Sequence, residues 1–356
     1  MTTRKTSHAL AATLATVLLA TGCSVSAGSD DEGSAAATKT VTLVTHDSFA
    51  ISDDLVADFE ESSGMTLEVV RSGDAGSLTN QLVLSKDEPV GDVVFGIDNT
   101  FASRAVEAGV LAEYVSSELP GSAGEFTLEG EGVEQLNPVD WGDVCVNVDD
   151  GWFQERGIAK PETLDDLLDP AYKDLFVTPA ASTSSPGFAF LLATIGKYGE
   201  DGWQDYWKRL MENGARVVAG WTDAYEVDFT AGGGGGDRPI VLSYNSSPPF
   251  TIPEGGERPT TSALLDTCFR QVEYAGVLDG TDNAEGAEAL VDFLVSPEFQ
   301  QSLPDSMYVF PVDDSVPLPP LWARWAKPAP APLEVPAEEI TEQRTEWLRE
   351  WSDLTS

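Results

Sequence analysis

The sequence predicts an α/β fold with a parallel sheet and crossover helices. From residue 40 onward, short β-branched runs alternate with segments whose apolar residues recur at helical spacing. Glycine follows the first and third of these helical segments, where a helix commonly ends. This alternating order is typical of parallel strands joined by helices. The 356 residues, 42% of them hydrophobic, are enough for two domains with sizeable cores.

The first region contains three strand–helix pairs. We predict strands at 41–45, 66–70 and 92–95, and helices at 53–62, 77–84 and 101–108. Ligands of such sheets bind beyond the carboxyl ends of the strands. His46, Asp47 and Ser48 follow the first strand, and Asp98 follows the third. Either aspartate alone is equally suited to cap the next helix, but polar groups at two equivalent strand ends favour a site.

A second α/β region extends from about residue 143 to 267. It contains an amphipathic helix at 203–211 and a buried strand at 240–244. Five consecutive glycines at 232–236 predict a mobile surface turn. They do not form a phosphate loop, because no Gly-Lys-Ser/Thr follows them.

The C-terminal part of the chain is expected to rejoin the first region. A strand is predicted at 271–277 and a helix at 284–294. The proline-rich stretch 311–336 is expected to be extended and to wrap over a surface, and a final amphipathic helix is expected at 338–354.

The N-terminus has the pattern of a secretory signal. Basic residues precede an apolar run at 9–20, and Thr21-Gly22-Cys23 follows. This is similar to a bacterial lipoprotein cleavage site, with Leu19 one place further out than in the commonest pattern. We predict a signal peptide at 1–22, lipidation of Cys23 that anchors the protein outside the cytoplasm, and a flexible tether to residue 39. A plain signal with a chance cysteine is the alternative.

The charge and the cysteine content of the chain limit the classes of partner and the cellular compartment that we expect. The chain has 60 acidic and 20 basic residues, a net charge of −40, which disfavours nucleic acid as a partner and most simply gives a solvated acidic surface. Beyond Cys23, the pair Cys145 and Cys268 is a plausible disulfide outside the cytoplasm, with two buried free thiols as the alternative.

The sequence lacks the residues that several kinds of catalytic site require. His46 is the one histidine of the mature chain, so zinc sites built from several His and Cys are excluded, and we predict no metal site. The sequence has no Gly-x-Ser-x-Gly elbow and no Gly-x-Gly-x-x-Gly after a strand. We therefore do not expect an enzyme or a bound cofactor. A hydrolase that uses Asp47 and Asp98 is the alternative from another class.

The segments 220–225 and 242–250 combine aromatic rings with small polar residues, including Asn245. Rings attract cations, although any single ring is more often ordinary core. The rings that could flank a flat cation are Trp221, Tyr225, Tyr244 and Phe250. Asp47 or Asp98 could receive an amino group of the same ligand.

A hydroxyl-rich segment at 182–187 precedes the apolar run 188–195. Hydroxyls and free N–H groups at a helix start can bind an anion, or can simply cap the helix. Together, the rings, the carboxylates and this segment predict a ligand that is a flat cation, has an amino group and can carry phosphate.

These motifs resemble the periplasmic thiamine-binding proteins of ABC importers. The resemblance covers nearly all the mature chain, and it is carried by the combination of several short motifs, at 45–49, 96–99, 139–142, 183–187, 220–225, 242–248 and 295–300. It implies a two-lobed periplasmic-binding-protein fold (type II) with a hinge and a ligand cleft. Lobe 1 would comprise 40–140 and 270–356, and lobe 2 would comprise 141–269.

The resemblance also implies the function. A monomeric, lipid-anchored protein would bind thiamine or a thiamine phosphate and deliver it to a permease and an ATPase carried by separate chains. Trp221 and Tyr244 would line the cleft, and Ser184 and Ser185 would meet the phosphate or hydroxyethyl end. The full set of candidate ligand-binding residues is His46, Asp47, Ser48, Asp98, Trp141, Thr183, Ser184, Ser185, Gly187, Trp221, Tyr225, Tyr244, Asn245, Phe250 and Tyr308.

Three departures from the family pattern affect the expected ligand contacts. The family often has Tyr where His46 and Phe250 stand, and Trp where Tyr308 stands. Phe250 therefore lacks the hydroxyl for a hydrogen bond, and Tyr308 offers a weaker cation–π attraction than Trp. A binding protein of the same fold for another cation, a polyamine or ferric iron, is the nearest alternative. The chain has no Tyr-Tyr pair of the kind that iron sites of relatives commonly use.

Overall fold

The computed structural model describes residues 39–128, 130 and 132–356. The predicted signal peptide, Cys23 and nearly all of the predicted tether lie outside these residues. Within them, residues 39–356 belong to one compact unit, and no helix is both long and apolar enough to cross a membrane.

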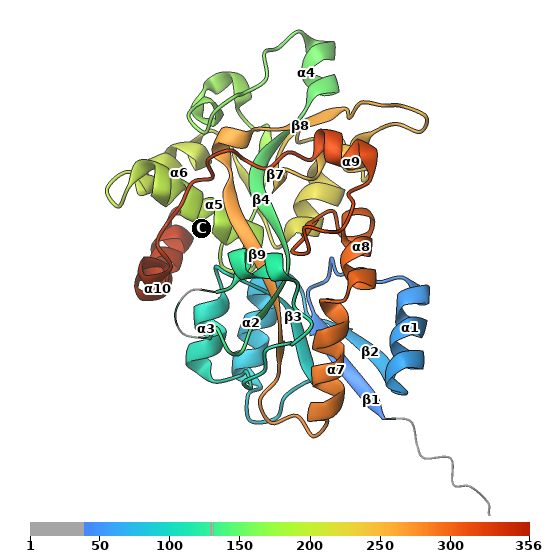
Figure 1. Cartoon of the computed structure of the whole chain (residues 1–356). Helices are drawn as coiled ribbons and strands as arrows, with labels where there is room; N and C mark the ends of the chain where they lie inside the picture. The colour runs from blue at the N-terminus through green and yellow to red at the C-terminus, as the bar shows by residue number, and fades with distance from the viewer. Residues whose placement is uncertain (1–38, 129, 131) are drawn as a thin grey trace, which may run out of the picture. The chain divides into compact units, whose positions relative to one another are not determined.

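One ten-stranded sheet organises the described chain. Its order is β2-β1-β3-β9-β4-β7-β5-β6, and β8 and β10 pair separately with β4 (Figure 1). The strands are β1 Thr40–Thr45, β2 Thr66–Arg71, β3 Val93–Asp98, β4 Asn137–Asp149, β5 Phe176–Pro179, β6 Arg216–Val218, β7 Ile240–Tyr244, β8 Thr261–Ala263, β9 Phe269–Val277 and β10 Phe310–Pro311.

The sheet is mixed, so the expectation of a parallel sheet is wrong for its centre. The three strands β1, β2 and β3 are parallel, and so are β5, β6 and β7. Between these groups, β9 pairs antiparallel with both β3 and β4, and β4 pairs antiparallel with β7. The long strands β4 and β9 therefore belong to both halves of the sheet. Local strand–helix alternation could not reveal this, because β9 arrives from a distant part of the sequence.

Ten α-helices accompany the sheet in the described part of the chain. They are α1 Asp53–Ser63, α2 Ala75–Leu84, α3 Ala102–Ala108, α4 Asp150–Arg156, α5 Ser185–Tyr198, α6 Trp203–Glu212, α7 Ala284–Leu294, α8 Pro297–Ser306, α9 Pro320–Trp325 and α10 Ala337–Thr355. Side-chain caps set several starts: Ser52 accepts from the Leu55 amide at α1, and Asp74 from the Ala75 amide at α2. The Asp74 cap explains why α2 begins two residues before the predicted start.

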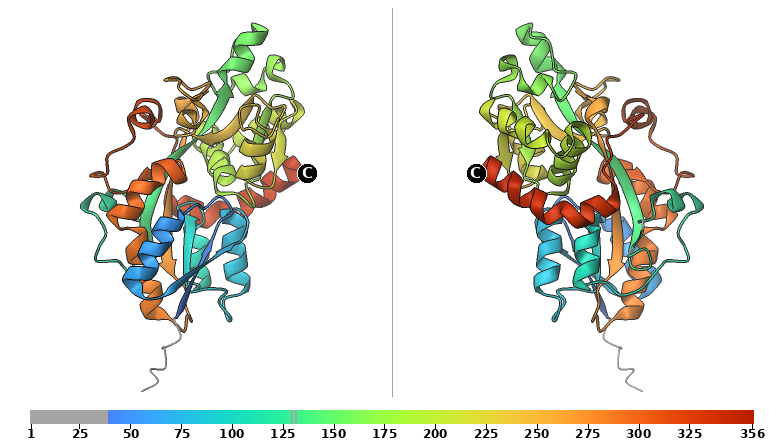
Figure 2. Two further views of the ribbon diagram at one scale, coloured as in Figure 1. Left: turned by 90° about the vertical axis from the view of Figure 1, so that its right-hand side faces the viewer. Right: turned by 90° about the vertical axis from the view of Figure 1, so that its left-hand side faces the viewer.

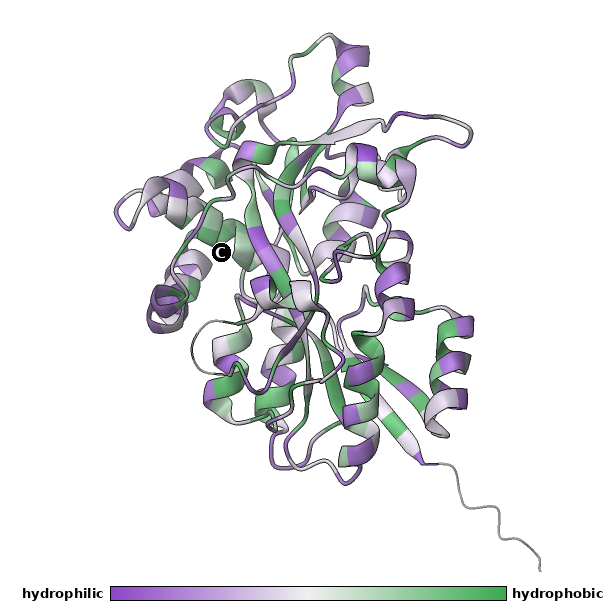
Figure 3. Ribbon diagram, viewed as in Figure 1, coloured by the Kyte–Doolittle hydropathy of each residue, from purple (hydrophilic) through white to green (hydrophobic). Residues whose placement is uncertain are grey.

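Apolar side chains fill both faces of the sheet, and many helices carry alternate hydrophobic and hydrophilic stripes (Figure 3). The last helix, α10, packs against α6 (Figure 2). Its Arg344 guanidinium lies 4.5 Å from the ring centroid of Phe101, which precedes α3, and 5.5 Å from that of Phe188 in α5, so α10 contacts residues of both regions of the chain.

Two expectations for irregular segments need correction. The stretch 311–336 is not uniformly extended, because the helix α9 lies within it. The glycines at 232–236 form a surface bend, but they are packed closely against backbone. A Cβ on Gly232 would lie 1.6 Å from the Tyr225 carbonyl oxygen, and one on Gly236 would lie 2.1 Å from the Asp228 carbonyl carbon. Only glycine permits this approach.

Cys145 and Cys268 form a disulfide in the structure, with their Cα atoms 4.2 Å apart. Cys145 lies within β4, and Cys268 directly precedes β9. The bond therefore links the two strands that belong to both halves of the sheet.

Candidate functional site

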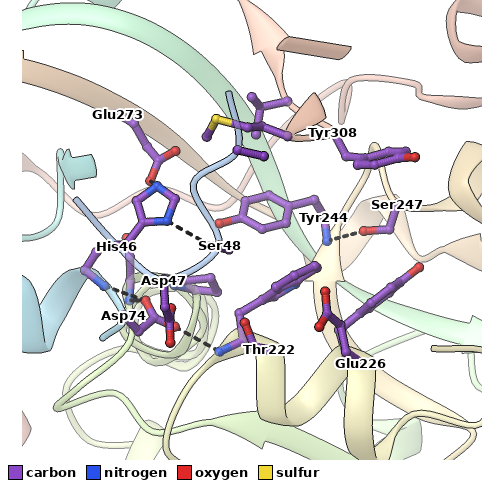
Figure 4. Close-up of a pocket in the computed structure, with 18 of the residues that line it drawn as sticks. His46, Asp47, Ser48, Asp74, Thr222, Glu226, Tyr244, Ser247, Glu273 and Tyr308 are labelled. Carbon is purple, nitrogen blue, oxygen red and sulfur yellow. Dashed lines mark hydrogen bonds and ion pairs between the residues drawn. The ribbon is translucent and has the colours of Figure 1, made fainter. Parts of the chain in front are cut away.

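A cavity of about 320 Å³ lies at the junction of the two halves of the sheet (Figure 4). Loops after β1 and the start of α2 line it from one half, and the start of α5, the 221–226 segment and the end of β7 line it from the other. Its lining residues are His46, Asp47, Ser48, Ala50, Asp74, Ala75, Ser185, Pro186, Trp221, Thr222, Tyr225, Glu226, Tyr244, Ser247, Phe250, Glu273, Ser306, Met307, Tyr308 and Val309. This volume is in the range of small-molecule sites.

One wall of the cavity is a run of aromatic rings. Trp221 and Tyr225 stack with their centroids 5.0 Å apart and an interplanar angle of 10°. Phe250 stands at 88° to Tyr308, at a centroid distance of 4.4 Å. Phe250 is 49% exposed, so this hydrophobic ring faces solvent at the cavity instead of packing into the core.

Backbone and side-chain contacts fix the position of this wall. The Trp221 indole Nε1 donates to Ser243 Oγ at 2.9 Å, and the Trp221 amide donates to Asp74 Oδ2 at 2.9 Å. The π-helical turn Asp223–Asp228 carries Tyr225, and the glycines at 232–236 pack beneath its backbone. The glycine run therefore supports the aromatic wall.

Four carboxylate residues line the cavity, and no lysine or arginine is among its described lining residues. The carboxylates are Asp47, Asp74, Glu226 and Glu273. Burial raises the pKa of Asp74, although the amides of Trp221, Ala75 and Ser185 donate to it and oppose this rise. The cavity therefore favours a positively charged occupant over an anion.

His46 is buried against this acidic surface. Its Nδ1 lies 2.9 Å from Ser48 Oγ, and its Nε2 lies 3.6 Å from Glu273 Oε1 (Figure 4). Burial, with a smaller effect from the charge of Arg71, lowers the pKa of His46 to about 4. The imidazole is therefore neutral at physiological pH and adds no positive charge to the cavity.

Asp98 is completely buried beneath the cavity and does not line it. Its Oδ1 accepts from the amides of Thr100 and Phe101, each at 3.0 Å, and its Oδ2 accepts from Ser185 Oγ. Burial raises the pKa of Asp98 to about 6, against these hydrogen bonds. Because Asp98 does not reach the cavity, the Asp47–Asp98 pair suggested for a hydrolase is not assembled.

Five further candidate residues also lie away from the cavity wall, each with a structural role. Trp141 stacks between Phe126 and Phe310, and Asn245 bonds to Asp143 and to the Lys327 carbonyl. Thr183 donates to the Ala219 carbonyl, Ser184 caps α5 by accepting from the Gly187 amide, and Gly187 packs against the backbone of Pro179 and Ala180.

The predicted anion site at the start of α5 is occupied by the protein's own carboxylates. The Ser185 amide donates to Asp74 at 3.2 Å, and the Ser185 hydroxyl donates to Asp98. Both carboxylates belong to the first region of the chain. The segment 182–187 therefore contributes contacts between the two halves of the sheet, and its donors are not directed at an empty anion pocket.

The structure brings together nine of the predicted ligand-binding residues, and it adds several that the sequence did not single out. The nine are His46, Asp47, Ser48, Ser185, Trp221, Tyr225, Tyr244, Phe250 and Tyr308. Among the additions, Asp74 stands three residues before the predicted helix 77–84, where a capping residue could have been noticed, and Ser247 lies in a motif already quoted. Glu226 and Glu273 carry no local signal in a chain with 60 acidic residues.

The protonation of the tyrosines that line the cavity argues against the alternative of a ferric-iron-binding protein. Burial raises the pKa values of Tyr225, Tyr244 and Tyr308, which disfavours the phenolates that would bind ferric iron. In the described chain, no group of three or more His, Cys, Asp and Glu side chains is arranged to hold a metal ion.

Comparisons with known proteins agree with this architecture. Residues 54–331 match the family model of bacterial extracellular solute-binding proteins. The thiamine-binding periplasmic protein of Escherichia coli is 29% identical over 328 residues, covering 89% of this chain and 93% of the relative. That of Brucella suis is 28% identical over 334 residues, covering 90% of this chain and 94% of the relative.

A solved structure of a periplasmic thiamin binding protein has a TM-score of 0.77 and 26% identity, and the match covers 90% of this chain and 97% of that one. These findings confirm the two-lobed periplasmic-binding-protein fold and the resemblance inferred from the motifs. They also agree with the expectation of a binding protein instead of an enzyme. The chain belongs to the family of bacterial extracellular solute-binding proteins.

Proposed function

We propose that this protein binds thiamine in the cavity and delivers it to the permease of an ABC importer. The observation that carries the proposal is the pairing of an aromatic wall with four carboxylate residues and no lysine or arginine among the described lining residues. Thiamine offers a flat, permanently charged thiazolium ring and an aminopyrimidine. The rings suit the former through cation–π attraction, and the carboxylates suit the amino group.

The arrangement of α5 supports a preference among the thiamine forms. A phosphate would need hydrogen-bond donors or cations, but the first amide of α5 and the Ser185 hydroxyl already donate to Asp74 and Asp98. Glu226, Asp47 and Glu273 would repel added negative charge. We therefore expect unphosphorylated thiamine to bind more tightly than thiamine monophosphate or pyrophosphate.

We propose that two lobes take part in delivery of the ligand. Lobe 1 comprises residues 40–140 and 270–356, and lobe 2 comprises residues 141–269. The strands β4 and β9 cross between the two halves and are the natural hinge. We further propose a monomer that is anchored by a lipid on Cys23 to the outer face of the cell membrane, with the permease and the ATPase on separate chains.

Calorimetric titration tests the ligand assignment. We expect thiamine to bind at least tenfold more tightly than either phosphate ester, and also more tightly than spermidine, which shares the positive charge but has no ring to stack. Incubation with the protein is expected to leave thiamine unchanged. Tighter binding of spermidine would favour the polyamine alternative, and turnover of thiamine phosphates would favour an enzyme.

A further inference from the structure

Two buried carboxyl groups face each other at the inner end of the cavity. Asp140 in β4 and Glu273 in β9 are direct partners in the antiparallel register, so their side chains lie on the same face of the sheet. Asp140 is 0% exposed and Glu273 is 6% exposed. Glu273 lines the cavity, and Asp140 lies behind it.

The hydrogen bonding around this pair is incomplete. The carboxyl groups of Asp140 and Glu273 hydrogen-bond to each other, and no donor from another residue reaches either carboxylate oxygen of Asp140. His46 Nε2, which lies 3.6 Å from Glu273 Oε1, has no hydrogen-bond partner. Unpaired buried polar atoms are costly, so their presence beside a cavity indicates an occupant with complementary charge. Two adjacent buried carboxylates without a cation cannot both be ionised at low cost.

The groups around the pair do not supply that cation. Those that face it from the neighbouring elements are His46 after β1, Asp74 at the start of α2, Asp98 in β3 and Tyr244 in β7. Arg71 of β2 acts on His46, whose ring is neutral. Burial raises the pKa of Asp140 above its usual range, and burial together with the charges of Asp140, Asp98 and Asp74 raises the pKa of Glu273 well above its usual range.

We propose that Asp140 and Glu273 together retain a proton in the empty cavity and release it to solvent when a cationic ligand occupies the cavity beside Glu273. The inference rests on the proposed function only in taking the ligand to be a cation. The O–H bond of the carboxyl group breaks, the proton passes to water and buffer, and the ligand's charge replaces that of the proton. Thiamine thus exchanges one positive charge for another.

The sign of the pH dependence follows from this exchange. Because binding releases a proton, lowering the pH opposes binding, and the affinity for thiamine rises with pH by up to tenfold per unit for each proton released. The rise is expected at every pH below the point at which the pair in the empty protein loses its proton unaided, a point that burial shifts above the usual range of a carboxyl group. Above that point the affinity levels off.

Calorimetry of unphosphorylated thiamine at pH 7, in phosphate and in Tris buffer, measures the release. Thiamine is the right probe because its quaternary ring nitrogen does not titrate, whereas a phosphate group titrates near pH 6 and would add its own protons. We expect the binding enthalpy to differ between the two buffers by an amount that corresponds to about one proton released per thiamine. Equal enthalpies in both buffers would overturn the proposal.

Three variants assign the proton to this pair. Glu273→Gln should abolish the release and weaken thiamine binding at least tenfold. Asp140→Asn removes the competing carboxyl group, so the proton release should fall by at least half. Glu68→Gln, which alters an exposed carboxylate on β2, should release protons as the wild type does. Full release by Asp140→Asn would contradict a shared proton.

The infrared absorption of protonated carboxyl groups gives a readout that needs no ligand. At pH 7 the empty wild-type protein should show a protonated carboxyl band that is missing in Glu273→Gln and reduced in Asp140→Asn. If thiamine does not bind the wild type, the proposed function fails, and this band still decides whether the proton is held. Absence of the band from the wild type overturns the proposal.

Discussion

Replacing Trp221 by alanine should weaken thiamine binding by about 2–3 kcal/mol, or roughly 30- to 150-fold in Kd. The substitution removes a ring that stacks on Tyr225 and lines the cavity, and with it the indole hydrogen bond to Ser243. Trp221 is only partly buried, so we expect the fold to remain intact. Isothermal calorimetry of the variant with thiamine measures the loss, and circular dichroism checks the fold.

Trp325→Ala is the matched control for this experiment. Trp325 lies in α9, does not line the cavity, and donates its indole N–H to the Glu257 carbonyl at 2.8 Å. The Trp325→Ala variant should bind thiamine as the wild type does. An unchanged affinity in the folded Trp221→Ala variant would show that the aromatic wall does not grip the ligand.

Replacing both Cys145 and Cys268 by alanine should lower the free energy of unfolding by about 4–5 kcal/mol. The two cysteines are 123 residues apart in sequence, and a bond that closes so long a loop restricts the unfolded chain strongly. Urea unfolding of the variant and of the wild type, both without reductant, gives the difference.

The single variant Cys145→Ala should lose as much stability as the double variant, because either change removes the bond. Wild-type protein unfolded with a strong reductant should approach the same value. A double variant as stable as the oxidised wild type would contradict a stabilising bridge between β4 and β9.

The local elements of the first region could be predicted from sequence because local signals specify them. The predictions for β1, β2 and α1 agree with the structure to within one residue at each end, since β-branched runs and terminal glycines mark them. The strand β4 was not predicted as an element. It runs from Asn137 to Asp149 and is buried on both faces for most of its length, so it lacks the alternation that marks a half-exposed strand.

The candidate site could be predicted where its chemistry is local. The 220–225 segment and its rings, and the residues after β1, were found because their residue types are unusual at those positions. Asp74 and Glu273 were missed because their roles depend on distant partners. Asp74 accepts hydrogen bonds from the amides of Ser185 and Trp221, which are more than 100 residues away in sequence. Glu273 becomes buried only when β9 lies between β3 and β4.

The same reasoning explains why the start of α5 differs from the expectation. Its serines have the composition of an anion site, and the sequence could not show that two carboxylates from the first region occupy the available donors. Composition identifies what a segment can bind, whereas tertiary packing decides whether the protein itself already fills that place.

A crystal structure of the protein with bound thiamine tests the central claim most directly. We predict that the thiazolium ring lies in the cavity, within about 6 Å of the ring centroids of the aromatic wall, and that the aminopyrimidine is directed at a carboxylate that lines the cavity. Thiamine bound elsewhere on the protein, with Trp221 and Tyr308 out of contact with it, would contradict the account.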